Sequence, residues 1–427
     1  MSLTRALAEF AATPTPNIPD TTARILRLSM LDWIACGMAG RDEPVAQITR
    51  AMGMDEGGAE QASVFGGGRL PARTAALING ATSHALDYDD THFAHIGHPS
   101  VAVFPAALAV AEAQGADGEA LQTAALIGIE ASIRVGVWLG RGHYQVGFHQ
   151  TGTAGAFGAA LAAGRLMGMD ADQLEAVLGL VSTRASGLKS QFGTMGKPFN
   201  AGIAASSGVE AALLVSKGFV PSLTGLDGAL GFGVTHHGAA DMSALDGLGQ
   251  DWLMDTISHK FHACCHGLHA SLEAIATIDA PEQIDRIDVV THPRWMSVCN
   301  QPAPMTGLGA KFSYATVLPM ALLGVDTARL ESYTEELCAR DDLQALRAKV
   351  HVSEDESLSE MQARVTVAGG GEIREAFYDL DAPMSVDDKT AKIDAKAASL
   401  LGNRAEEAAG LVSTKAPAAE LGAFIRG

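Results

Sequence analysis

The stretch GTAGAFGAALAAG at residues 152–164 consists almost entirely of small residues and contains neither a proline nor a charge. Alanine favours the helix, and small side chains let neighbouring helices approach closely. Further Ala- and Leu-rich stretches, each bounded by Gly, Pro or Asp, occur at 76–86, 101–114, 118–140, 173–186 and 201–217. We therefore predict a bundle of long buried helices from Ile18 to about Leu245.

The pattern changes after about residue 280. IDRIDVVTHP (284–293) and LRAKVHVS (346–353) alternate as strands do, and ARVTVAGGGEIREAFYDL (363–380) predicts a hairpin around a glycine turn. The tail from Asp387 is again helical in character. The predicted fold class is mainly α, with a large all-helical domain of residues 1–250 completed by 395–427 and a smaller α+β domain of residues 251–394.

Composition narrows the function classes. The chain has 427 residues, 47% of them hydrophobic, with a net charge of −19, so we expect neither nucleic acid nor a membrane surface as a partner. A small anionic substrate would need cations gathered locally. The N-terminus lacks an apolar secretion segment, and five cysteines are too few for a disulfide framework, so a cytoplasmic location is expected.

The first candidate site is the segment DYDDTHFAHIGHPS (87–100). Asp87, Asp89 and Asp90 crowd three carboxylates into four positions, which raises some carboxylate pKa values and suits acid–base work. Pro99 opens the next helix, so His98 lies near a helix N-terminus, a position that favours an anionic ligand and discourages protonation of the imidazole. A polar loop with an Asp helix cap is the structural alternative.

The second candidate is SHKFHACCHGLHASLEA (258–274). His262, His266 and His269 have the spacing i, i+4 and i+7, which predicts one helical face. No metal is expected, because the HExxH motif is absent and the adjacent Cys264 and Cys265 are poor chelators. Hydrogen bonding to substrate carboxylates, or core packing of some members, is favoured instead.

Two further segments carry single polar groups among small residues. Lys189 and Lys197 are isolated cations in the Gly-rich segment SGLKSQFGTMGKPFNAG (186–202), where ordinary surface lysines are the alternative. His149 precedes the helix of very small residues in VGFHQTGTAG (146–155), and a lone histidine there is more often a structural neighbour than a catalyst.

Taken together, the sequence resembles the MmgE/PrpD family, which contains 2-methylcitrate dehydratase, cis-aconitate decarboxylase and iminodisuccinate epimerase. The motifs occur in the family's order: NGATSHALDYDDTH (79–92), GHPS (97–100), GFHQTGTAG (147–155), GTMGKPFNAG (193–202), KFHACCHGLHA (260–270), TGLGAKFS (306–313) and PMSVDD (383–388). The resemblance implies a helical domain built from both chain ends, an α+β lid domain, an active site in the cleft between them, and a homodimer.

The resemblance also assigns residues. Asp87, Thr91, His98, His149 and Lys197 match family catalytic positions. The decarboxylase has a further histidine where the simplest alignment places Cys264, with His266 and His269 close behind, and its loop before the residue matching His98 is one residue shorter. We take His266 as catalytic, and the residues expected to bind substrate are Lys189, Cys264 and His269.

The implied chemistry is proton transfer at a carbon beside a carboxylate. Lys197, His98 and His149 are candidates to hold the substrate carboxylates and the developing enediolate. Asp87, oriented by Thr91, is a candidate base or proton relay, and His266 or His269 is a candidate for the proton on the opposite face. No redox cofactor, metal or Schiff base is required.

Three function classes follow. The first is a cofactor-independent lyase that dehydrates or decarboxylates a small di- or tricarboxylate. The second is an epimerase or racemase of a polycarboxylate such as iminodisuccinate, acting by two-base proton transfer. The third is a non-catalytic helical binding protein, against which the clustered His, Asp and Lys segments argue.

Overall fold

The computed structural model describes residues 2–427 and divides the chain into two compact units. The helical unit contains residues 2–259 and 386–427, and the α+β unit is Lys260–Ser385. The predicted class, mainly α with a smaller α+β domain, is confirmed. The sequence boundaries at 251 and 394 lie outside the observed α+β unit, which is shorter at both ends.

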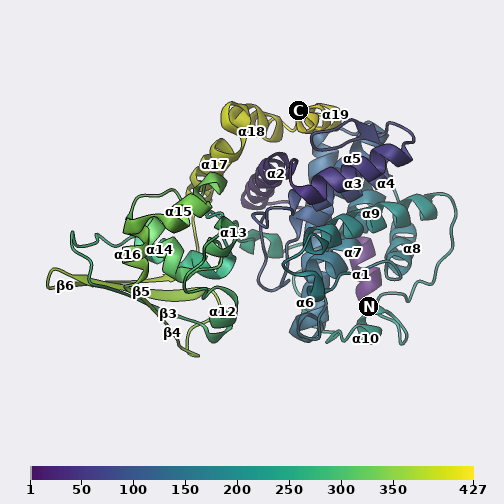
Figure 1. The fold of residues 1–427 in the computed structure, drawn as a ribbon. Helices are drawn as coiled ribbons and strands as arrows, with labels where there is room; N and C mark the ends of the chain where they lie inside the picture. Colours follow the sequence, from purple (N-terminus) through teal and green to yellow (C-terminus); the bar gives the residue numbers. More distant parts are fainter. Residues whose placement is uncertain (1) are drawn as a thin grey trace. The chain divides into compact units, whose positions relative to one another are not determined.

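Long helices built from both ends of the chain form the helical unit (Figure 1). Its helices are α1 (Leu3–Ala12), α2 (Asp20–Gly40), α3 (Pro44–Glu56), α4 (Ala72–Ser83), α5 (Ser100–Gln114), α6 (Gly118–Gln145), α7 (Gln150–Leu166), α8 (Ala171–Val181), α9 (Gly196–Ser216), α10 (Phe232–Thr235), α17 (Val386–Leu401), α18 (Ala405–Ser413) and α19 (Ala418–Arg426). A short antiparallel ladder joins β1 (Ala62–Ser63) to β2 (Arg69–Leu70).

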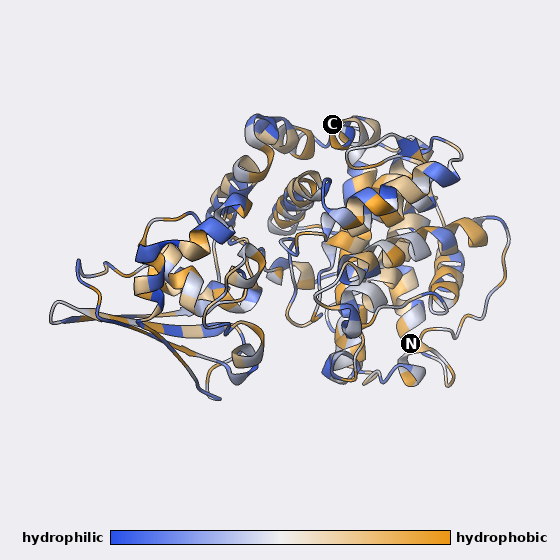
Figure 2. Ribbon diagram, in the orientation of Figure 1, coloured by the Kyte–Doolittle hydropathy of each residue, from blue (hydrophilic) through white to orange (hydrophobic). Residues whose placement is uncertain are grey.

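Small residues set the helix spacing at the centre of this unit. Helices α4, α5, α6, α7 and α9 pack on one another there. A side-chain carbon at Gly80 of α4 would lie 2.8 Å from the backbone of Gly202 in α9, so only glycine permits this crossing. Figure 2 shows hydrophobic residues concentrated in these packed helices. The glycines and alanines of the sequence thus serve close helix packing.

Two central helices are long and apolar enough to cross a membrane by length and composition alone. They are α6 and α9, and 83% and 67% of their most apolar windows are buried inside the unit. Helix α6 also carries the buried ion pair of Arg134 with Glu130, 2.7 Å apart. Burial of this kind is what the core helices of a helical bundle require.

The α+β unit is a four-stranded sheet covered by short helices. Its strands are β3 (Arg286–Thr291), β4 (Val350–Glu354), β5 (Gln362–Gly369) and β6 (Glu372–Asp379), in the order β4-β3-β5-β6. Its helices are α11 (His269–Ala276), α12 (Pro293–Val298), α13 (Gly307–Ala310), α14 (Tyr314–Leu322), α15 (Glu335–Ala339) and α16 (Asp341–Arg347).

The sheet follows the sequence pattern closely. Strand β5 alternates between buried and half-buried residues, and its buried face packs against α11. The predicted hairpin is confirmed by the antiparallel pairing of β5 with β6 around Gly370 and Gly371, both with positive φ. The strand predicted at 346–353 begins at Val350, because Leu346 still belongs to α16.

Candidate active site

The connection between α4 and α5 carries most of the predicted acid–base groups. It runs from His84, the C-cap of α4, to Pro99, which precedes α5. Asp87 and Ile96 both have positive φ, at 52° and 55°. Such left-handed turns are uncommon outside glycine and cluster at functional sites. The two turns bring residues that are distant along the loop next to one another.

Asp89 bridges two imidazoles inside this loop. Its carboxylate lies 2.9 Å from Nδ1 of His84 and 2.8 Å from Nδ1 of His98, and all three side chains are nearly inaccessible to solvent. Burial alone would raise the pKa of Asp89, but the attraction of His84 and His98 outweighs it and holds that pKa well below the usual value. Asp89 is therefore an ionised acceptor that fixes both rings.

His98 contacts a second carboxylate on its other face. Its Nε2 is 3.5 Å from Oδ1 of Asp87. The ring therefore lies between two carboxylates. His98 is consequently placed to exchange a proton at Nε2 while Asp89 holds Nδ1.

Lys197 supplies a cation to the same group of side chains. It lies in the first turn of α9, and its Nζ is 2.6 Å from Oδ2 of Asp87. The lysine side chain is 16% exposed and that of Asp87 40%, so this end of the cluster is open to solvent. An incoming carboxylate can thus reach a cation that is already in place.

His149 is the neutral member of the cluster. It is the N-cap residue of α7, and its ring stacks beside His84 with centroids 6.0 Å apart. Burial, with the electrostatic influence of His84 and Lys197 adding to it, holds the pKa of His149 well below its usual value. Asn200 Nδ2 donates to Nδ1 at 3.1 Å. The proton of the neutral ring is consequently on Nε2, which is a hydrogen-bond donor.

Thr91 and Lys189 have other contacts in the structure. The Thr91 hydroxyl donates to the carbonyl of Ser258 at 3.3 Å, and the backbones of the two residues also pair. Lys189 donates from Nζ to the carbonyl of Tyr144 at 3.1 Å and lies over the tyrosine ring. The structure therefore brings together Asp87, His98, His149 and Lys197, and shows Lys189 held by Tyr144. Together with His84 and Asp89, these four gathered residues form what we call the first cluster.

The second histidine group has a different backbone from the one predicted. The single helical face is wrong: His266 belongs to a short 3-10 turn, His266–Leu268, and His269 begins α11, while His262 precedes both. The rings nevertheless gather, since the centroid of His269 is 5.0 Å from that of His262 and 4.7 Å from that of His266. The rings therefore meet through a 3-10 turn that leads directly into α11 and not along one face of a single helix.

Burial controls the chemistry of this second group. It holds the pKa of His269 well below the usual value, with His266 and His262 adding to the effect, and Nε2 of His269 contacts the carbonyl of Cys264 at 3.3 Å. Burial also raises the pKa of the Cys264 thiol to about 12. Both predicted binding groups are therefore uncharged at neutral pH.

Four side chains of the first cluster have the composition of a divalent-cation site. One ligand atom from each of His84, Asp87, Asp89 and His98 lies within 4.8 Å of the others. Imidazole and carboxylate are common donors for such ions. The Lys197 ammonium, however, already contacts Asp87, and a metal ion beside it would meet a like charge. The arrangement consequently favours acid–base chemistry.

Two members of the cluster were not singled out from sequence. His84 contacts Asp89, and its buried Nε2 has no hydrogen-bond partner among the described residues. Asn200 sets the tautomer of His149. The only signal for them was position: His84 precedes the carboxylates in DYDD by a few residues, and Asn200 follows Lys197 by three, about one helical turn.

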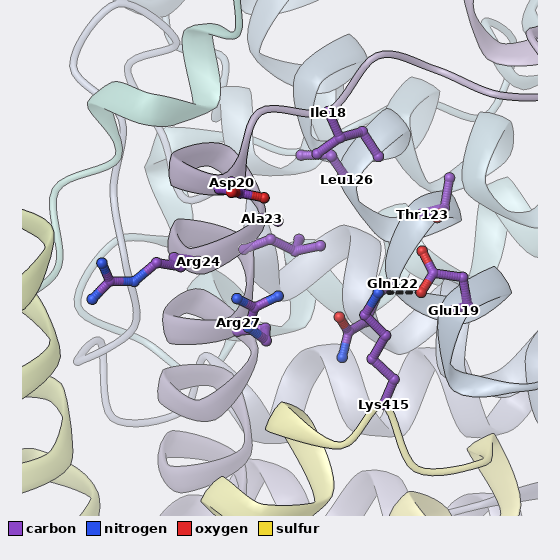
Figure 3. Close-up of a pocket in the computed structure, with 11 residues that line it drawn as sticks. Ile18, Asp20, Ala23, Arg24, Arg27, Glu119, Gln122, Thr123, Leu126 and Lys415 are labelled. Carbon is purple, nitrogen blue, oxygen red and sulfur yellow. Dashed lines mark hydrogen bonds and ion pairs between the residues drawn. The ribbon is translucent and has the colours of Figure 1, made fainter.

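A separate hollow in the helical unit contains none of these residues. It has a volume of about 390 Å³ between α2 and α6 and is shown in Figure 3. Its charged lining residues are largely paired: Lys415 with Glu119, and Arg24 with Asp387. This hollow therefore lacks the convergent acid–base groups of the first cluster.

Comparison with known proteins gives a consistent result. Residues 5–245 match the model of the MmgE/PrpD N-terminal domain, and residues 262–415 match that of the MmgE/PrpD C-terminal domain. The chain is 28% identical over 402 residues to a cis-aconitate decarboxylase of Aspergillus terreus, covering 85% of this chain and 81% of the relative. It is 29% identical to human cis-aconitate decarboxylase over 244 residues, covering 55% of this chain and 50% of the relative.

Proposed function

This chain belongs to the MmgE/PrpD family, and we propose that it is a cofactor-independent lyase that decarboxylates or dehydrates a small tricarboxylate. The observation that carries the proposal is that a proton-transfer pair and a cation lie in one cluster of side chains. A His98–Asp89 dyad is suited to proton transfer, and the Lys197 ammonium is suited to holding an anion. Cis-aconitate, named for the relatives, is the first substrate to test.

Binding comes first in the proposed sequence. The partly exposed Lys197 ammonium receives a substrate carboxylate, and His149 donates to it from Nε2. Neither group needs to reorganise, because Asp87 and Asn200 already hold them. Donors fixed in this way stabilise the charge that develops on an oxygen better than water does.

Proton transfer follows at the carbon beside that carboxylate. In decarboxylation the C–C bond to the leaving carboxylate breaks, carbon dioxide departs, and the electron pair is delocalised onto the remaining carboxylate as an enediolate. The His98 imidazolium then delivers a proton from Nε2 to carbon, and Asp89 stabilises the imidazolium before transfer. In dehydration the same nitrogen, unprotonated, removes the α-proton, and the imidazolium so formed returns that proton to the departing hydroxyl, which leaves as water. Acid–base assistance of this kind contributes about 10²- to 10⁴-fold in rate.

The test is proton NMR in D₂O with cis-aconitate, citrate, 2-methylcitrate and iminodisuccinate. A new vinylic product, or loss of a carboxylate, supports the lyase and identifies its substrate. Exchange of an α-proton for deuterium with an unchanged skeleton would replace the lyase by an epimerase. Silence across the panel would contradict the proposal, and turnover that survives chelator treatment would support cofactor independence.

A further inference from the structure

A second buried polar cluster lies directly behind the loop that carries Asp87 and Asp89. Its centre is Lys396 of α17, whose side chain is 2% exposed. The Lys396 Nζ is 2.5 Å from Oδ1 of Asp32 in α2 and donates to the carbonyl of Tyr88 at 2.6 Å. The same ammonium lies 3.8 Å from the centre of the Tyr88 ring. Tyr88 stands between Asp87 and Asp89, so this cation holds the backbone that presents both carboxylates.

The charge on Lys396 is maintained although it is buried. Burial alone would lower the pKa of Lys396, but the attraction of Asp32, with Asp89 adding to it, leaves that pKa raised. A buried ion pair is often no more stabilising than a well-packed apolar pair of similar volume. Stability therefore does not explain this lysine by itself, and its contact with the Tyr88 carbonyl gives a more specific role.

The other groups around Lys396 come from several elements. On the loop, Asp90 accepts from the Ser100 hydroxyl at 2.5 Å, and burial, with Asp32 next in effect, raises the pKa of Asp90 to about 8. On α2, burial raises the pKa of the Cys36 thiol. His259, which contacts the Ser29 hydroxyl at 3.0 Å, has its pKa lowered by burial. Asp32 is thus the carboxylate that pairs with Lys396.

The two points at which the chain leaves and re-enters the helical unit both lie next to this cluster. The chain leaves the unit after His259 and re-enters it at Val386, the first residue of α17. Thr91 in the middle of the loop pairs with Ser258, and Lys389 of α17 donates to the carbonyl of Ile257 at 3.3 Å. The C-terminal segment is consequently joined to the loop as well as to α2.

We propose that Lys396 is a positioning residue for the site: its buried ammonium, held by Asp32, fixes the Tyr88 carbonyl and thereby the directions of the Asp87 and Asp89 carboxylates. Asp87 then meets Lys197, and Asp89 meets His84 and His98. The proposal rests on the function proposed above for its catalytic meaning. The positioning of the loop by Lys396 is a property of the substrate-free protein and can be measured without substrate.

The variants separate positioning from stability. Lys396→Met removes the ammonium that pairs with the buried Asp32 and is expected to lower the melting temperature. The double variant Asp32→Asn with Lys396→Met removes both charges, so it is expected to recover much of that loss, yet it cannot donate to the Tyr88 carbonyl. Lys392→Met, one turn earlier on α17, is the matched control.

Two measurements follow on the folded double variant. Nitrogen-15 NMR of the substrate-free protein is expected to show shifted imidazole signals for His84 and His98, unchanged in the Lys392 control. Turnover is expected to fall about 10- to 100-fold in kcat with KM within about threefold of native, as a misplaced proton-transfer group requires.

Native imidazole signals in the double variant would overturn the positioning role, as would native kcat. If the native protein turned over none of the panel substrates, the proposed function would fail while the imidazole signals still decided the role of Lys396.

Discussion

Two groups of histidines in this molecule differ in what surrounds them. In the helical unit, His84 and His98 share the ionised Asp89, and Lys197 neutralises Asp87 nearby. In the α+β unit, His269 contacts the carbonyl of Cys264 and is held neutral by burial. Histidine clustering is common to both groups. In the first, one buried carboxylate contacts two imidazoles, and in the second Glu273 lies 3.5 Å from Nε2 of His262.

The difference shows which feature makes a histidine cluster chemically active. An imidazole can donate or accept a proton near neutral pH only when its surroundings support both charge states. In the first group the two imidazoles contact Asp89, whose pKa they hold well below its usual value, whereas burial holds the pKa of His269 well below its usual value. The first group is therefore suited to proton transfer, and His269 to neutral hydrogen bonding.

The largest expected effect is at the cation of the first group. Lys197→Ala leaves Asp87 without its ammonium partner and removes the group proposed to hold the substrate anion. We expect kcat/KM to fall about 10³-fold or more while the fold survives. Lys217→Ala, at the other end of α9, is the control and should remain within about twofold. Normal turnover of the Lys197 variant would remove this residue from the mechanism.

The next effect concerns the bridging carboxylate. Asp89→Asn keeps the shape of the side chain but removes the charge shared by His84 and His98, so we expect kcat to fall about 10²- to 10³-fold. His84→Gln breaks one side of the bridge and should cost less than Asp89→Asn. Steady-state kinetics on both variants tests this order. A His84 variant worse than the Asp89 variant would indicate that His84 itself transfers the proton.

The second histidine group is predicted to be the weaker contributor. If His266 provides a second proton-transfer group, His266→Gln should lower kcat about 10- to 100-fold. The matched change His262→Gln alters a ring that contacts Thr327 and should have little effect on turnover. Equal, near-native activity of the two variants would assign this histidine group to packing and restrict the chemistry to the first.

The sequence allowed the fold class to be predicted because its periodicities are local. The Ala-rich helices and the hairpin at 363–380 depend on neighbours a few residues away. The shape of the second histidine group could not be predicted in this way, since spacing alone does not distinguish an α-helix from a 3-10 turn at His266. There the helical prediction was wrong.

The residue types of the site could be predicted from the sequence, but the hydrogen bonds and ion pairs between these residues could not. Asp87, His98, His149 and Lys197 were named from motifs, and the structure gathers them. The bridge through Asp89 and the tautomer set by Asn200 depend on left-handed turns and helix crossings, which no local pattern specifies. The contact of Lys396 with Tyr88 joins residues 308 apart in the sequence, so only the folded chain reveals it.

The smallest expected effect is on the free energy of unfolding. It tests whether Asp90, which faces the interior, differs in protonation from Asp89, which contacts the histidines of the site. Burial raises the pKa of Asp90 to about 8, far above that of an unfolded aspartate, so the folded chain binds a proton that the unfolded chain releases. Stability from this group is therefore full below about pH 4 and declines as the pH rises toward 8, by at most about 1.4 kcal/mol per pH unit.

Asp90→Asn keeps the hydrogen bond from Ser100 without the titration, and it should flatten this decline. Urea unfolding at pH 5 and pH 8 measures it: native protein should lose about 1 to 4 kcal/mol more than the variant over that interval. Asp55→Asn, an exposed carboxylate on α3, should leave the native slope unchanged. Equal slopes for native and Asp90→Asn protein would mean that Asp90 is ionised in the fold. The contrast between the protonated interior carboxylate and the ionised Asp89 beside it would then disappear.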